Sequence, residues 1–287
     1  MKVPFVDLQA QYLAHRDVID AAIADVIQNT AFIGGDAVKS FELAYAEHYG
    51  VEHCVSCANG TDAIYIALKM MGIGPGDEVI TTPISWVATS NVILSVGAKP
   101  VFVDIDPITR NIDLNKVAAA ITSKTRAIMP VYLAGLPVDM DQLYGLAKQY
   151  KLRVIEDAAQ AFGSLWQGKK IGSFGDLVSF SFQANKNLTT IEGGCLVLNN
   201  LEEAKLAEKF RLQGLTRQGM DGMDVDVLGG DVEVVEEVLP HEAVIALQRI
   251  RLHRPVFVEV ERPNARQIQP RGLLQTNQLG VDPDWRS

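Results

Sequence analysis

The order of apolar segments from residue 52 onward constrains the fold more than any other feature of this sequence. Short apolar strands alternate with helix-length segments whose apolar residues recur at helical spacing. Such alternation predicts an α/β fold with a mostly parallel sheet covered by helices on both faces. Two amphipathic helices are expected before it, over 7–28 and 36–49. The expected strands are 51–56, 78–81, 100–105, 126–132 and 152–156, and the expected helices are 61–71, 86–96, 113–121 and 139–150.

A single lysine, Lys186, stands between two further strand-like segments. Ser179 to Phe182 alternate small hydroxyl side chains with aromatic ones, as in a strand with one buried face, and an apolar segment resumes at Cys195 after the sequence EGG. A lysine on a short loop is most often an ordinary solvated charge. Ligands of parallel sheets bind at the carboxyl ends of the strands. The other strand ends therefore decide whether Lys186 is functional.

Three other strand ends carry residue types suited to one ligand. Asn59-Gly60-Thr61 opens an apolar helix, where free backbone amides and a hydroxyl can bind a phosphate, and a capped helix without a ligand is the alternative. Trp86 follows the second strand and offers a ring for stacking, although a lone tryptophan is more often part of a core. Asp157 follows an apolar strand, where a carboxylate is either a helix cap or is paired with a positive charge.

A phosphate cradle, a flat ring, a carboxylate and a lysine together describe a site for pyridoxal phosphate. Lys186 can hold the cofactor aldehyde as a Schiff base and later move a proton between the substrate carbon and the cofactor carbon. Asp157 can keep the pyridine nitrogen protonated, which the cofactor needs to act as an electron sink. Trp86 can stack on the ring. The expected phosphate donors are Gly60, Thr61 and Ser181.

The composition is that of a globular protein and removes several function classes. The chain has 287 residues, 48% of them hydrophobic, and its formal net charge of −9 argues against a nucleic-acid-coating surface. No apolar run is long enough to cross a membrane, and Asp7 precedes any signal-peptide core, so a cytoplasmic location is expected. Cys54 and Cys57 would point in different directions along a strand, and the histidines are scattered. We therefore expect buried free thiols and no metal site.

Six segments of the sequence together resemble one family of enzymes. They are SCANGTDAI, TTPISWVATSN, AGLPVDMD, VIEDAAQAFGS, GSFGDLVSFSFQANKN and TTIEGG. They occur in the same order and spacing as in the sugar aminotransferases of the DegT/DnrJ/EryC1/StrS family. The resemblance runs from about residue 4 to about residue 216. It implies the type I fold of pyridoxal-phosphate-dependent transferases, that of aspartate aminotransferase, with a three-layer arrangement around a mostly parallel sheet.

The resemblance also assigns roles to individual residues. It implies that Lys186 is the Schiff-base lysine, that Asp157 is the partner of the pyridinium nitrogen, and that Trp86 is the stacking ring. Gln160 is expected near the ring hydroxyl of the cofactor. Relatives that dehydrate sugars carry histidine in place of the lysine, so Lys186 favours amino transfer. The residues expected at the cofactor phosphate are Gly60, Thr61 and Ser181.

The family moves an amino group, usually from L-glutamate, to a nucleotide-linked keto-sugar in a ping-pong cycle, and a homodimer is expected by the same resemblance. The ending TTIEGG resembles members that aminate carbon 4 more than members that aminate carbon 3. It therefore favours a 4-keto sugar in lipid A or surface polysaccharide precursor synthesis. Two alternatives stay open. One is a non-catalytic or truncated relative that binds the cofactor, and the other is a different activity on the same fold, such as amino-acid decarboxylation or cysteine desulfuration.

The last seventy or so residues depart from the family pattern. Residues 1–216 are expected to form the cofactor-binding large domain with its N-terminal helices, and 217–287 a partial or divergent C-terminal segment. The segment HEAVIALQRIRL resembles the start of the family's long helix, but no family pattern follows it. We therefore expect a truncated or atypical small domain and a mostly unfolded tail past residue 254. No residue here matches the asparagine that a partner subunit brings to the cofactor phosphate in the family.

Overall fold

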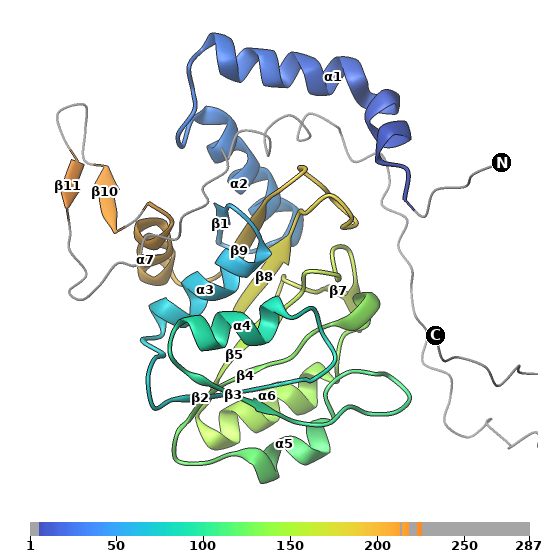
Figure 1. The fold of residues 1–287 in the computed structure, drawn as a ribbon, viewed down its shortest axis with the longest axis vertical. Coiled ribbons are helices and arrows are strands. Elements are labelled where there is room, and N and C mark those ends of the chain that lie inside the picture. The colour runs from blue at the N-terminus through green and yellow to red at the C-terminus, as the bar shows by residue number, and fades with distance from the viewer. Residues whose placement is uncertain (1–5, 213, 218–222, 226–287) are drawn as a thin grey trace, which may run out of the picture. The chain divides into compact units, whose positions relative to one another are not determined.

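The computed structural model describes residues 6–212, 214–217 and 223–225, and the central element of these residues is a seven-stranded sheet (Figure 1). β9 runs antiparallel to both of its neighbours, and every other pair in this sheet is parallel. The predicted α/β class with a mostly parallel sheet is therefore confirmed. The strand order is β1 (His53–Cys57), β9 (Gly194–Leu198), β8 (Leu177–Ser181), β5 (Arg153–Asp157), β4 (Thr125–Met129), β2 (Glu78–Thr81) and β3 (Lys99–Phe102).

Helices cover both faces of this sheet (Figure 1). The helices are α1 (Leu8–Gln28), α2 (Asp36–Tyr49), α3 (Gly60–Met70), α4 (Ala88–Ser95), α5 (Leu114–Ala120), α6 (Met140–Tyr150) and α7 (Leu201–Arg211). α3, α4 and α7 pack on one face, where Leu68 and Ile93 are fully buried. α2, α5 and α6 pack on the other face, where Val117 and Leu143 are fully buried. Burying each such side chain contributes roughly 1.5–3 kcal/mol.

The sequence around α6 shows why a predicted helix forms where it does. The carboxylate of Asp139 accepts a hydrogen bond from the backbone N–H of Gln142 at 3.1 Å, which caps the first turn. Leu143 and Ala147, four residues apart, both lie in the core beneath the sheet. Lys151 adopts a left-handed conformation with a φ of 55° and ends the helix. The expected helix over 139–150 thus differs from the observed one by a single residue.

The strand predicted around Ser179 to Phe182 is present as β8, but the expectation that only one of its faces is buried was wrong. β8 lies inside the sheet between β5 and β9, and both Ser179 and Phe180 are 1% exposed. The hydroxyl of Ser179 donates to the backbone carbonyl of Glu156 at 3.0 Å, so its burial leaves no unpaired donor. The alternation of serine and phenylalanine therefore reflects a hydroxyl that is satisfied inside the sheet rather than in water.

Several short elements were not expected from the sequence. They are η1 (Leu133–Gly135) and two hairpins, β6 (Leu165–Trp166) with β7 (Lys169–Lys170), and β10 (Leu215–Arg217) with β11 (Met223–Val225). Cys54 and Cys57 lie in the cores on opposite faces of the sheet, and the three free thiols are buried, as predicted.

The predicted C-terminal features lie outside the described residues. These are most of the segment 217–287, the helix expected at HEAVIALQRIRL and the tail past residue 254. Every described residue belongs to one compact unit. Within the described part of the chain, every helix is too short or too polar to cross a membrane.

Candidate cofactor site

Asp157 is the last residue of β5, and its carboxylate is buried at the carboxyl edge of the sheet. The residue is 6% exposed. The Thr89 hydroxyl donates to Oδ2 of Asp157 at 2.8 Å, and the backbone N–H of Ala159 donates to Oδ1 at 3.2 Å. Burial raises the pKa of the Asp157 carboxyl, whereas these two hydrogen bonds and the positive charge of Lys186 lower it. The carboxylate is therefore neither a helix cap nor a solvated surface charge.

Lys186 lies half-buried on the loop that joins β8 to β9. Its backbone N–H donates to the carbonyl of Gln183 at 2.8 Å, and the backbone N–H of Thr190 donates to the carbonyl of Phe182 at 2.9 Å, which folds the loop back on itself. Among the described residues, Lys186 forms no ion pair. Because its charge lowers the pKa of Asp157, its ammonium acts on that carboxylate from beyond contact distance.

The start of α3 lies in close contact with the end of β8. The side chain of Asn59 caps the helix by accepting from the backbone N–H of Asp62 at 2.8 Å. A Cβ on Gly60 would lie 2.7 Å from Cβ of Ser181 and 3.2 Å from its hydroxyl oxygen, so only glycine allows this approach. Thr61 is exposed in the first turn of α3. Backbone amides at a helix start beside one hydroxyl form a site suited to a phosphate.

Gln160 has a side chain held by the main chain of η1. Its Oε1 accepts a hydrogen bond from the backbone N–H of Ala134 at 2.8 Å. This contact fixes the orientation of the amide, because the oxygen is engaged and the NH₂ group is left to donate. Ala134 itself adopts a left-handed conformation with a φ of 52°. Gln160 lies three residues after Asp157, so an amide donor accompanies the carboxylate after β5.

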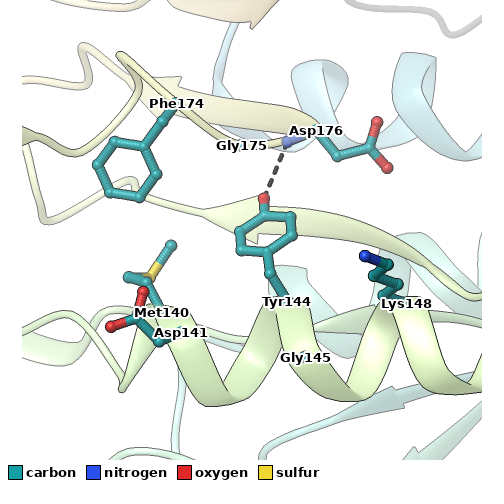
Figure 2. A pocket seen from close by; sticks show the side chains of 8 residues that line it. All are labelled: Met140, Asp141, Tyr144, Gly145, Lys148, Phe174, Gly175 and Asp176. Carbon is teal, nitrogen blue, oxygen red and sulfur yellow. Dashed lines mark hydrogen bonds between the residues drawn. The ribbon is translucent and has the colours of Figure 1, made fainter.

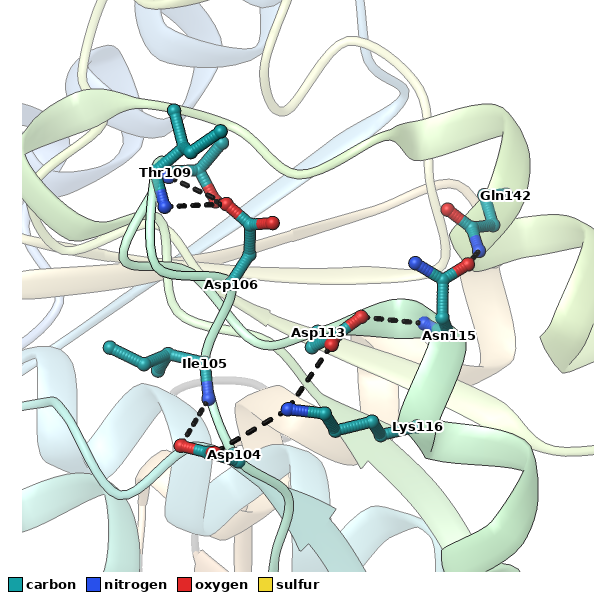
Figure 3. A network of polar contacts seen from close by, with 9 residues as sticks. Asp104, Ile105, Asp106, Thr109, Asp113, Asn115, Lys116 and Gln142 are labelled. Atoms are coloured by element: carbon teal, nitrogen blue, oxygen red, sulfur yellow. Dashed lines mark hydrogen bonds and ion pairs between the residues drawn. The ribbon is translucent and has the colours of Figure 1, made fainter.

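The η1 segment is itself held by Asn111, a buried residue in the loop between β3 and α5. Nδ2 of Asn111 donates to the carbonyl of Leu136 at 2.6 Å, and Oδ1 accepts from the backbone N–H of Leu133 at 3.1 Å. The loop that carries Asn111 is ordered by its own polar contacts (Figure 3). In it, Oδ1 of Asp106 accepts from both the backbone N–H and the hydroxyl of Thr109.

Trp86 lies in the turn between β2 and α4 and is 75% exposed. This exposure argues against a core tryptophan, the alternative left open by the sequence. The backbone N–H of Thr89 donates to the carbonyl of Trp86 at 3.1 Å. One turn of chain therefore carries both an open aromatic ring and the hydroxyl that binds Asp157.

A separate open pocket of about 650 Å³ lies between α6 and the segment that precedes β8 (Figure 2). Its lining includes Met140, Tyr144 and Lys148 from α6, with Phe174 and Asp176 opposite. The Tyr144 hydroxyl accepts a hydrogen bond from the backbone N–H of Asp176 at 2.8 Å. None of the site residues predicted from the sequence lines this pocket.

The structure brings one pair of predicted site residues into contact, relates a second pair through electrostatics, and adds residues that sequence reasoning missed. Gly60 is in close contact with Ser181, and the charge of Lys186 acts to lower the pKa of the Asp157 carboxyl. The missed residues are Ser85, Thr89, Asn111 and Ala134. Ser85 and Thr89 flank the start of α4, which begins at Ala88, so their contact is set by the turn before the helix and not by helical spacing. Ala134 acts through its backbone N–H, which no sequence pattern marks.

The residues present fit pyridoxal phosphate. The buried Asp157 can meet a protonated ring nitrogen, Lys186 supplies an amine for the aldehyde, and the backbone amides at the start of α3 beside the Ser181 hydroxyl can bind the phosphate. The fold and this set of groups define the class of pyridoxal-phosphate-dependent transferases with the type I fold.

Comparison with known proteins gives the family within that class. Residues 14–236 match the DegT/DnrJ/EryC1/StrS aminotransferase family, and the chain belongs to it. The family's cofactor is pyridoxal phosphate. UDP-N-acetyl-3-dehydro-alpha-D-glucosamine 3-aminotransferase of Acidithiobacillus ferrooxidans is 43% identical over 217 residues, which cover 76% of this chain and 58% of that protein.

Two further relatives support the same assignment. UDP-4-amino-4-deoxy-L-arabinose–oxoglutarate aminotransferase of Shewanella sediminis is 37% identical over 238 residues, which cover 82% of this chain and 60% of that protein. The X-ray crystal structure of S. venezuelae DesV is similar with a TM-score of 0.79 and 37% identity, covering 88% of this chain and 65% of that one. This chain thus spans about three fifths of the length of the relatives.

Proposed function

We propose that this chain is the large domain of a pyridoxal-phosphate-dependent aminotransferase that moves the amino group of L-glutamate to a nucleotide-linked keto-sugar. The observation that carries the proposal is the buried carboxylate of Asp157, which accepts a hydrogen bond from Thr89 and whose pKa is raised by burial against the opposing charge of Lys186. A buried carboxylate acted on by the charge of a lysine, an exposed tryptophan, and a helix start beside a serine hydroxyl together match the needs of this cofactor. The family that the chain belongs to supports the same activity.

Each proposed residue has a separate task. When bound, pyridoxal phosphate supplies an electron sink that stabilises negative charge on the carbon next to the transferred amino group. Nζ of Lys186 holds the cofactor aldehyde and, once released, carries a proton between the substrate carbon and the cofactor carbon. Asp157 accepts a hydrogen bond from the protonated ring nitrogen, and Gln160 donates to the ring hydroxyl. Trp86 stacks on the ring.

We infer that the phosphate of the cofactor lies against the start of α3. Gly60 and Thr61 offer backbone amides there, and Ser181 adds a hydroxyl from the end of β8. The positive end of the helix dipole favours the same anionic group.

The sugar is proposed to carry its ketone at carbon 4, on the basis of the TTIEGG segment, and to serve lipid A or surface polysaccharide synthesis. The two named relatives include both positions, because one is a 3-aminotransferase of a UDP-linked sugar and the other acts on a 4-amino-4-deoxy sugar. The second name also contains oxoglutarate, the keto acid that L-glutamate leaves behind, which supports glutamate as the donor. The cytoplasmic location stays a prediction.

A homodimer is also part of the proposal. Large apolar side chains are exposed on the described N-terminal helices and their connection, including Leu13 at 56%, Ile33 at 60% and Leu43 at 72%. Apolar surface of this kind is typical of regions that contact another chain. Sedimentation of the full chain loaded with cofactor would give its subunit number.

The activity is tested by following one half of the cycle at a time. The full chain with pyridoxal phosphate is mixed with L-glutamate, and 2-oxoglutarate is measured before and after a UDP-linked 3-keto or 4-keto sugar is added. We expect about one equivalent of 2-oxoglutarate per chain without acceptor, and repeated turnover only when the 4-keto sugar is present. Lys186→Ala should release none, whereas Lys148→Ala, in the separate pocket, should behave as the unaltered protein.

Other outcomes point to the alternatives. Cofactor binding without any 2-oxoglutarate would contradict the transfer and favour a non-catalytic relative. Carbon dioxide release from an amino acid without a sugar would favour a decarboxylase. Turnover with the 3-keto sugar alone would keep the enzyme class and overturn the choice of carbon 4.

A further inference from the structure

Thr89 lies at the start of α4 and connects Asp157 to a second hydroxyl. It is 2% exposed, and its Oγ1 donates to Oδ2 of Asp157 at 2.8 Å. The hydroxyl of Ser85, four residues earlier, lies 2.7 Å from the same Thr89 oxygen. Three side chains from two separate segments therefore form one continuous row of hydrogen bonds that ends on the buried carboxylate.

The direction of both hydrogen bonds follows from the number of protons. A threonine hydroxyl has one proton, and a carboxylate can only accept. The Thr89 proton must therefore point to Asp157, which leaves the Thr89 oxygen to accept from Ser85. A hydroxyl that accepts one hydrogen bond becomes a stronger donor in the next, so the Ser85 contact strengthens the bond to Asp157.

We propose that Thr89, supported by Ser85, is a positioning residue that fixes the orientation of the Asp157 carboxylate that is to meet the ring nitrogen of the cofactor. The inference rests on the proposed function, because it gives Asp157 the role described above. It adds two residues to the site, and both act through Asp157 rather than on the cofactor.

The surroundings of Asp157 make such support necessary. Burial raises the pKa of its carboxyl, and the groups that act against burial are Thr89, the backbone N–H of Ala159 and the charge of Lys186. Among these groups, Thr89 is the one that contacts Asp157 through a side-chain hydrogen bond.

The test separates the hydroxyl of Thr89 from its methyl group. Thr89→Val keeps the buried volume and removes the donor, whereas Thr89→Ser keeps the donor and removes the methyl group. Ser85→Ala removes only the second hydroxyl. Ser90→Ala is the matched control, because that hydroxyl donates to the carbonyl of Val87 and not toward Asp157.

Two quantities are measured on the full chain. The first is the ¹³C chemical shift of the Asp157 carboxyl against pH in cofactor-free protein, assigned by comparison with Asp157→Asn. The second is the dissociation constant of pyridoxal phosphate. We expect Thr89→Val to move the titration of Asp157 upward and to weaken cofactor binding by roughly tenfold, with a smaller change in the same direction for Ser85→Ala. Thr89→Ser should restore both quantities, and Ser90→Ala should change neither.

A packing role alone would give the opposite order, with Thr89→Ser more impaired than Thr89→Val. That order, or an Asp157 titration that Thr89→Val leaves unchanged, would overturn the proposal. The unaltered protein could fail to bind pyridoxal phosphate while Thr89→Val still shifts the titration of Asp157. The proposed function would then be wrong, but the effect of Thr89 on the Asp157 carboxylate would be confirmed. If all variants bind the cofactor equally well, the function survives and the positioning role does not.

Discussion

At the residue scale, β5 ends in two neighbouring carboxylates that face opposite sides of the sheet and have different environments. Asp157 is held by Thr89 on one side. Glu156 is completely buried on the other, where its two oxygens accept from the hydroxyls of Tyr132 at 2.7 Å and Tyr144 at 2.5 Å. A carboxylate after an apolar strand was expected to need a positive partner. Glu156 has neutral donors instead, because two tyrosines distant in sequence converge on it.

The pKa of Glu156 leads to a testable pH dependence. Burial raises this pKa to about 7 from an ordinary value of 4.5, and the tyrosine hydrogen bonds offset burial only in part. Between these two values the folded protein keeps a proton that the unfolded chain releases, so stability falls as pH rises through that window. Glu156→Gln should remove this loss, which we estimate at about 2 kcal/mol between pH 5 and pH 8.

Urea unfolding at the two pH values measures the effect. Glu208→Gln, at an exposed position on α7, should retain the pH dependence of the unaltered protein. If Glu156→Gln loses as much stability between pH 5 and pH 8 as the unaltered protein does, the assignment to Glu156 is wrong.

At the element scale, the start of β9 presses against the start of α3. A Cβ on Gly194 would lie 2.3 Å from the carbonyl carbon of Asn59, which is closer than any side chain allows. The sequence was sufficient to predict the helix start at Gly60 and the strand after EGG, because turn and cap residues mark them locally. The contact between the two elements depends on the register of β9 with β1 and was not predictable from either segment.

Two glycine substitutions should therefore have opposite effects on stability. Gly194→Ala should lower the free energy of unfolding by about 1–3 kcal/mol, because the backbone around Asn59 must move. Gly145→Ala should raise it by about 0.5–1 kcal/mol, because Gly145 lies within α6 and a Cβ there would meet no heavy atom within 4 Å. Chemical denaturation of both variants provides the values. Equal shifts in the same direction would show that the close approach at Gly194 is not tight.

At the scale of the whole molecule, the regular alternation of strands and helices was enough to predict the layers, but not the order of the strands. β9 lies antiparallel between β1 and β8. β1 and β9 are far apart in the chain, and no local pattern shows that they pair. Likewise, the serine at position 179 predicted a side chain facing solvent, whereas the structure has the Ser179 hydroxyl buried. We propose that the large domain ends near residue 216, as the sequence pattern indicates.

The most direct test of the proposed site is to find which lysine holds the cofactor. The full chain is loaded with pyridoxal phosphate, treated with sodium borohydride so that the bond between cofactor and amine becomes permanent, and digested for mass spectrometry. We predict the label on the peptide that contains Lys186, and none on that peptide in Lys186→Ala. A label spread over surface lysines, or confined to another lysine such as Lys148, would contradict the site proposed here.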